Sequence, residues 1–141
     1  MRAFSLSLSS LTNRPFREES QRAFLDFLGE DALSPRRAQR GVYTARRFDD
    51  GAGHSVLVVA LDMRFHKDPY EGAFCERCDF LGEEQWAWLD ATLSASDADA
   101  HVIVSSLQLL ESRGGLGESW ARFPSARRRV MQMLANVPST K

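Results

Sequence analysis

An apolar run opens at Ser55 and continues through Val-Leu-Val-Val-Ala to Leu61. It shows no alternation of polar and apolar residues and is rich in β-branched valine, which is typical of a strand buried on both faces. A second stretch of this kind, His-Val-Ile-Val-Ser-Ser, spans residues 101–106. The pattern therefore predicts two buried strands, about forty residues apart in the chain.

A helical pattern lies between the two strands, over residues 82–93. Trp86, Leu89 and Leu93 recur at spacings of three and four, and two glutamates in the first turn favour the helix dipole. A strand, a helix and a strand in this order form most simply a right-handed crossover between parallel strands. We therefore expect an α/β fold in which this helix packs on the sheet through its three apolar residues.

The segment before the first buried strand predicts two short helices and a strand. Residues 17–28 form the first helix, which Gly29 closes. Ser34 and Pro35 start the second as N-cap and first helical residue, and this short helix is expected to end near Gly41. Residues 41–48 alternate weakly and predict a strand that pairs with the first buried strand as a hairpin. The apolar face of the first helix, with spacings of three and four, comprises Ala23, Phe24, Phe27 and Leu28.

The segment after the crossover predicts a last helix over residues 124–134. Its apolar residues Val130, Met133 and Leu134 are expected to face the core. Residues 62–81 and 107–123 form long connections that follow the two buried strands, and connections of this length are often functional.

Composition places the chain among ordinary globular proteins. It has 141 residues, of which 43% are hydrophobic and 26% charged, and a net charge of −1. This charge argues against non-specific binding to nucleic acid, which needs a basic face, and no run approaches the about 20 apolar residues of a membrane helix. Residues 1–16 contain no acid, as is typical of an organelle transit peptide, but the stretch is short and holds only two arginines, so we expect a disordered or misassigned start instead.

Two cysteines occur in the sequence Cys75-Glu-Arg-Cys78. A structural zinc site would need a second pair of Cys or His ligands at matching spacing, and the chain has none. A redox pair of the thioredoxin type lies between a strand and a helix start, and this pair does precede the helix at Gly82. We expect two loop cysteines, either free or bridged in an oxidising compartment.

Four segments of the chain match motifs of one family in order and spacing. They are Leu-Asp-Met-Arg-Phe-His-Lys-Asp-Pro at 61–69, Leu-Gly-Glu-Glu-Gln-Trp-Ala-Trp-Leu at 81–89, Val-Ser-Ser-Leu-Gln at 104–108 and Trp-Ala-Arg-Phe-Pro at 120–124. They resemble the LDxR, LGxxQWxWL, SSxQ and WxxFP patterns of the PhoD-like (alkaline phosphatase D) metallophosphatases. The helix from residue 17 resembles the family's PFREESxxAFxDFL segment. Met63 departs from the family, which usually has Thr there.

The resemblance implies a fold and an activity. Residues 15–136 would be the central part of a PhoD-like domain, with residues 1–14 unmatched and residues 137–141 a tail. The family fold is a four-layer α/β/β/α sandwich, of which this chain would supply part, including the strand–helix–strand crossover. The family hydrolyses phosphate mono- or diesters with divalent metal ions such as calcium, iron, manganese or zinc, so a phosphate ester is the implied substrate.

The family's metal ligands lie in motifs that this sequence lacks. They are an early Asp motif, a GD motif, a WDDHDxGxND stretch before the PFREES segment and a GDxH stretch further on, and none occurs in the printed chain. The resemblance therefore assigns no metal ligand here. We expect the chain alone to hold no metal ion and to be inactive, as the product of a truncated gene model or a split gene.

Candidate pocket residues follow the two buried strands, because ligands of open α/β sheets collect beyond the carboxyl ends of the strands. Asp62 or His66 could ligate a metal, and Arg64 could bind a phosphate with its guanidinium fork. Alternatively, Asp62 and Arg64 pair with each other or with loop backbone. His54 and His101 begin the strands and are expected at the opposite edge, without a chemical role. The candidates at the useful edge are Asp62, Arg64, His66 and Gln108, with Ser105 and Ser106 beside them.

Other motifs are weaker. The glycine-rich residues 113–119 lack the ending of a phosphate-binding P-loop and predict a flexible loop, and the serines at 105 and 106 are not in a G-x-S-x-G elbow. Two alternatives to the phosphatase remain: a non-catalytic protein that binds a partner through uncovered strand edges, and a redox or metal-binding module built on the cysteine pair. The flanking coding sequence would discriminate them, and the chain itself assigns neither the substrate nor a compartment.

Overall fold

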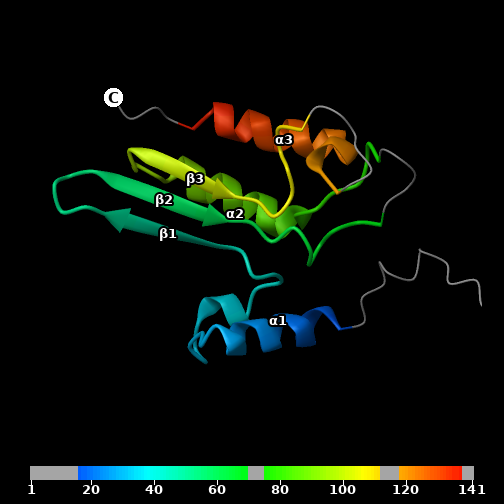
Figure 1. Cartoon of the computed structure of the whole chain (residues 1–141), viewed down its shortest axis with the longest axis horizontal. Helices are drawn as coiled ribbons and strands as arrows, with labels where there is room; N and C mark the ends of the chain where they lie inside the picture. The colour runs from blue at the N-terminus through cyan, green and yellow to red at the C-terminus, as the bar shows by residue number, and fades with distance from the viewer. Residues whose placement is uncertain (1–15, 70–74, 112–117, 138–141) are drawn as a thin grey trace, which may run out of the picture.

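A computed structural model describes residues 16–69, 75–111 and 118–137 (Figure 1). Regular structure begins just inside the described chain and alternates between helices and strands. The elements in chain order are α1 (Arg17–Phe27), η2 (Pro35–Arg37), β1 (Thr44–Asp49), β2 (Ser55–Ala60), α2 (Gly82–Ser94), β3 (Ala100–Val104), η3 (Trp120–Arg122) and α3 (Pro124–Ala135).

The three strands form one mixed sheet in the order β1-β2-β3. β1 and β2 pair as an antiparallel hairpin, with Arg46 opposite Val58. β2 and β3 are parallel, with Val58 opposite Val102, and α2 forms the crossover between them. The predicted hairpin and the predicted parallel pair are both confirmed, and the chain has the predicted α/β character.

The core lies between one face of this sheet and the helices that follow it. α2 turns Trp86, Leu89 and Leu93 inward, with exposed fractions of 1%, 0% and 3%, so its predicted face is confirmed. α3 places Val130 in the same core, and Met133 and Leu134 pack against it partly buried, as predicted.

The opposite face of the sheet is open in the described part of the chain, and here a prediction was wrong. β2 alternates between buried and partly buried residues, and β3 alternates between exposed and partly buried ones, so neither strand is buried on both faces. The register places Phe48, Val102 and Val104 on the open face, where they are 53%, 47% and 48% exposed. β2 carries apolar residues on both of its faces, which gives the uninterrupted apolar run. The described elements cover only one of these faces.

The helix predicted over residues 17–28 is confirmed as α1, but its apolar face is not its buried face. Phe24, Phe27 and Leu28 are 45%, 85% and 50% exposed, and Ala23 is exposed as well, whereas Leu25 and Gln21 are buried. The reason is local hydrogen bonding by the Gln21 amide. Its nitrogen donates to the carbonyl oxygens of residues 36 and 39, and its oxygen accepts from the backbone N–H of residue 41. A polar side chain thus faces inward because it satisfies backbone groups of the loop that α1 packs on.

The second helix begins as predicted but is shorter. The Ser34 hydroxyl accepts a hydrogen bond from the Arg36 N–H, and Pro35 is the first residue of η2, which is one 3₁₀ turn and does not extend to Gly41. The described helices include none with the length and apolarity that a bilayer crossing requires. The predictions for residues 1–16 and 113–119 fall almost entirely outside the described residues.

Candidate functional site

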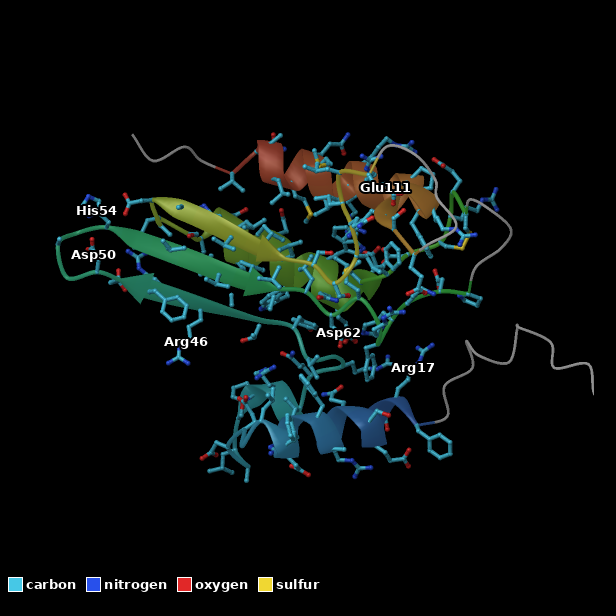
Figure 2. All side chains as sticks on the ribbon, in the orientation of Figure 1. Arg17, Arg46, Asp50, His54, Asp62 and Glu111 are labelled. Carbon is cyan, nitrogen blue, oxygen red and sulfur yellow. A yellow bond between two sulfur atoms is a disulfide. The ribbon has the colours of Figure 1, made fainter. Side chains whose placement is uncertain are left out.

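The carboxyl ends of β2 and β3 lie side by side, as the parallel pairing requires. The Leu61 N–H donates to the Val104 carbonyl at 3.0 Å, which continues the ladder by one step past β2. The loops that begin at Asp62 and Ser105 therefore leave the sheet at the same edge, which Figure 2 marks with the Asp62 label. We call this edge, with residues 62–69 and 105–108, the carboxyl edge.

Asp62 is a structural carboxylate of this edge. Its Oδ1 accepts from the N–H groups of Arg64 and Phe65 at 2.8 and 2.9 Å, and its Oδ2 accepts from the N–H of Val42 at 2.8 Å. Its backbone exchanges two hydrogen bonds of 2.8 Å with the buried amide of Gln85 on α2. Both carboxylate oxygens thus hold backbone amides in place.

Arg64 belongs to a cluster of three charges. Its guanidinium lies 2.6 Å from Glu118 Oε2, and the ammonium of Lys67 lies 3.5 Å from Glu118 Oε1. The side chain of Lys67 is only 7% exposed, whereas those of Arg64 and Glu118 are 46% and 35% exposed. Two cations thus share one carboxylate. The Arg64 guanidinium therefore pairs with Glu118 and not with the Asp62 carboxylate. Asp62 pairs with loop backbone, which was the other form of the predicted alternative.

His66 packs against the start of α2. Its Nε2 lies 3.0 Å from the Arg40 carbonyl oxygen, and its ring contacts that of Phe65 with centroids 4.9 Å apart. A Cβ atom at Gly82 would lie 2.7 Å from the His66 ring, and Gly82 has φ +71°, so only glycine fits there. His66 therefore helps to fix the entry into α2, and its described contacts do not include a carboxylate that could complete a metal site.

Of the candidate residues after β3, Ser105 is engaged in hydrogen bonds through its side chain, whereas Ser106 and Gln108 are exposed. The Ser105 hydroxyl donates to the Leu107 carbonyl and accepts from the indole N–H of Trp120, at 2.8 and 3.0 Å. Gln108 accepts from the Trp120 N–H through its backbone oxygen at 3.2 Å, while Gln108 and Ser106 are exposed. Three of the predicted candidates, Asp62, Arg64 and His66, therefore lie together in the segment that follows β2. Among the contacts of the described residues, none joins the fourth candidate, Gln108, to these three.

Cys75 and Cys78 form a disulfide, so the bridged alternative is correct. Both are buried, with exposed fractions of 6% and 8%, and belong to the core. Asp79, which follows them, caps α2 by accepting from the Gly82 N–H at 2.7 Å, and it also accepts from the Trp86 indole at 2.8 Å. The disulfide therefore lies in the loop whose Asp79 holds the first turns of α2 in place.

The same loop is tied to the carboxyl edge and to α3. The Asp68 N–H donates to the Asp79 carbonyl at 2.9 Å, and the Asp79 N–H donates to Asp68 Oδ2 at 2.8 Å. Glu76 accepts from Arg128 and from the Ser125 hydroxyl on α3, and these donors hold the pKa of Glu76 below its ordinary value, the Arg128 guanidinium having the larger effect. Three residues of this site were not predicted from the sequence, and each contacts a residue that is distant in the chain. Gln85 binds the backbone of Asp62, and Lys67 pairs with Glu118.

Metal-binding geometry is not found in the part of the chain that the structure describes, where no group of three or more His, Cys, Asp or Glu residues converges. His54 pairs with Asp50 at 2.8 Å at the edge opposite to Asp62, as predicted (Figure 2). His101 lies 2.9 Å from the Ser96 hydroxyl, near the start of β3 and therefore at that same opposite edge. Two surface depressions of about 250 and 420 Å³ border α3 and do not involve the carboxyl edge.

No protein-family model, no curated protein and no solved structure matches this chain.

Proposed function

We propose that the chain is the central part of a PhoD-like metal-dependent phosphatase domain, which in its full form hydrolyses phosphate mono- or diesters. The observation that supports it is that the four motif segments contact one another. Asp62 of the first is bonded to Gln85 of the second. Trp86 of the second meets Trp120 of the fourth edge-on, with ring centroids 6.4 Å apart, and Trp120 donates to Ser105 of the third. A sequence signature whose members are spread over sixty residues is thus one contact network.

In this proposal the cations of the carboxyl edge bind the phosphate group. Arg64 is half-exposed and offers a planar fork that suits phosphate oxygens, and Lys67 stands behind it as a second positive charge. Glu118 holds both cations in place until a phosphate, with more charge, competes for the Arg64 guanidinium. The proposed role of Arg64 is to orient the ester and to stabilise the charge that develops on its phosphoryl oxygens.

The metal ions of the family do not fit the residues described here. Two ions would polarise the phosphoryl oxygens and supply hydroxide, which needs several converging ligands. Asp62 is committed to three backbone N–H groups, and His66 lies on a carbonyl oxygen and against Gly82. The proposal therefore assigns the ligands to polypeptide that carries the upstream DDHD-like and downstream GDxH-like stretches, and it gives this chain the phosphate-binding wall alone.

The experiment is to sequence the flanking coding region, express the polypeptide that includes both stretches, and assay hydrolysis of a chromogenic phosphate ester with added divalent metal. Arg64→Ala should lower turnover about 10- to 100-fold, the range that corresponds to one charge-assisted hydrogen bond. Arg47→Ala is the matched control, because Arg47 pairs with Asp49 and Asp97 at the opposite edge. Flanks without either stretch, or equal turnover of the two variants, would contradict the proposal.

A second candidate function is binding of a protein partner through the open face of the sheet. The observation that favours it is the apolar surface that Phe48, Val102 and Val104 expose on neighbouring strands. Larger exposed apolar patches mark interaction sites. Replacing both valines with threonine keeps the β propensity and removes apolar surface. If this face is the binding site, the wild-type chain associates in light scattering and the threonine variant does not; a wild-type monomer at all concentrations rules out self-association.

A further inference from the structure

We propose that the Cys75–Cys78 disulfide is a reversible thiol–disulfide switch, which in its oxidised form fastens the loop over residues 75–81 between α3 and the carboxyl edge. The inference goes beyond the proposed hydrolysis and does not depend on it. The reductant is a dithiol. Its thiolate attacks one sulfur to give a mixed disulfide, and its second sulfur then displaces the protein, so that two protein thiols and one cyclic disulfide result. Two electrons and two protons pass from the dithiol to the cysteines.

Two sets of anchoring contacts hold this loop, one at Cys75 and Glu76 and the other at Asp79. On the first side, the Cys75 N–H donates to the Arg122 carbonyl at 2.9 Å, and Glu76 is held by Ser125 and Arg128 of α3. These contacts attach the start of the loop to η3 and α3.

On the second side, the residue after Cys78 is Asp79, which is bonded to Asp68 of the carboxyl edge and to Gly82 and Trp86 of α2. The disulfide therefore fixes the spacing between an anchor on α3 and an anchor on α2 and the carboxyl edge. Breaking it lets the two anchored parts move relative to each other.

The contacts allow a folded chain in both redox states. Only Glu76 and Arg77 lie between the cysteines, so the bridge closes a very short loop and constrains the unfolded chain less than a bridge across a long loop would. None of the anchoring hydrogen bonds uses a sulfur atom. Cys78 Sγ lies 3.5 Å from the Pro69 carbonyl oxygen, which a thiol can use as an acceptor and a disulfide sulfur cannot. The reduced Cys78 sulfur thus has a hydrogen-bond acceptor.

The test uses the full 141-residue chain, first oxidised and then equilibrated with dithiothreitol at a temperature well below unfolding. Thiols are counted by alkylation and mass spectrometry, and Tm and amide hydrogen exchange are measured for both states. The reduced chain should still unfold cooperatively, with a Tm about 5 °C lower. Its amides from Cys75 to Gly82 should exchange at least about tenfold faster, because those bonds open locally, while β2 should be unchanged.

A double variant, Cys75→Ser with Cys78→Ser, serves as the control, since its Tm should match the reduced chain and should not respond to dithiothreitol. Asp97→Ala, whose side chain is 84% exposed and lies in the loop between α2 and β3, should leave the response to dithiothreitol in place. Thiols that appear only at temperatures where the chain unfolds would overturn the proposal, as would reduction with equal exchange in both states. Neither readout involves turnover, so failure here is distinct from failure of the proposed function.

Discussion

Removal of the Asp62 carboxylate should destabilise the fold strongly, although sequence reasoning treats this residue as a candidate for chemistry. Asp62→Ala deprives three backbone N–H groups, those of Val42, Arg64 and Phe65, of their acceptor. A buried donor left unsatisfied costs about 1–3 kcal/mol, and the amides at 42 and 64 are only partly buried, so water can replace part of the loss. The free energy of unfolding should therefore fall by about 3–5 kcal/mol.

The assay is urea denaturation of the isolated chain, followed by far-ultraviolet circular dichroism. Asp62→Asn is the matched variant, because it keeps the shape and one acceptor oxygen, and it should lose roughly half as much as Ala. Asp97→Ala, whose side chain is 84% exposed, should change stability by less than about 0.5 kcal/mol. A loss below about 1 kcal/mol for Asp62→Ala would refute the structural role and return Asp62 to the candidates for a metal ligand.

Three further predictions concern α2 and the loop before it. Trp86→Ala should cost about 3–5 kcal/mol in denaturant titrations, because the ring is 1% exposed; a cost below about 1 kcal/mol would place the ring outside the core. Replacing Cys75 and Cys78 together with serine should cost about 2 kcal/mol through the lost chain constraint, and an unchanged denaturation midpoint would contradict this. Glu76 has a pKa below its ordinary 4.5 because Arg128 donates to it, so its contribution is present above that pH and lost as the pH falls through the folded pKa. Glu76→Gln should therefore reduce the acid sensitivity of Tm, and identical pH profiles would argue against the pair.

The sequence predicted best what local patterns determine. The apolar run of β2, the spacing of Trp86, Leu89 and Leu93, and the strand that follows were sufficient for the parallel crossover, because each pattern depends on neighbours in the chain. The extent of burial was not predictable in the same way. A strand with apolar residues on both faces has the same uninterrupted run in its sequence whether one face or both faces are covered. The run of β2 therefore does not reveal that the described part of the chain covers only one face.

The polar contacts across loops were the least predictable. Gln21 faces inward because its amide satisfies three backbone groups of a loop fifteen or more residues away, and periodicity carries no signal for this. The pairing of Arg64 with Glu118 joins two loops that are distant in the sequence. Lys67 was the exception, since it lies in the segment after β2 where ligands are expected, and its position alone could have identified it.

We propose that this chain carries the phosphate-binding wall of a PhoD-like phosphatase and that other polypeptide carries its metal site. The most direct measurement is hydrolysis of a chromogenic phosphate ester by the purified 141-residue chain, with calcium, iron, manganese or zinc added in turn. Asp62 is committed to backbone amides, and the described residues bring no three ligands together, so we expect no turnover above that of the metal in buffer. Turnover that requires added metal and disappears with a chelator would contradict the account.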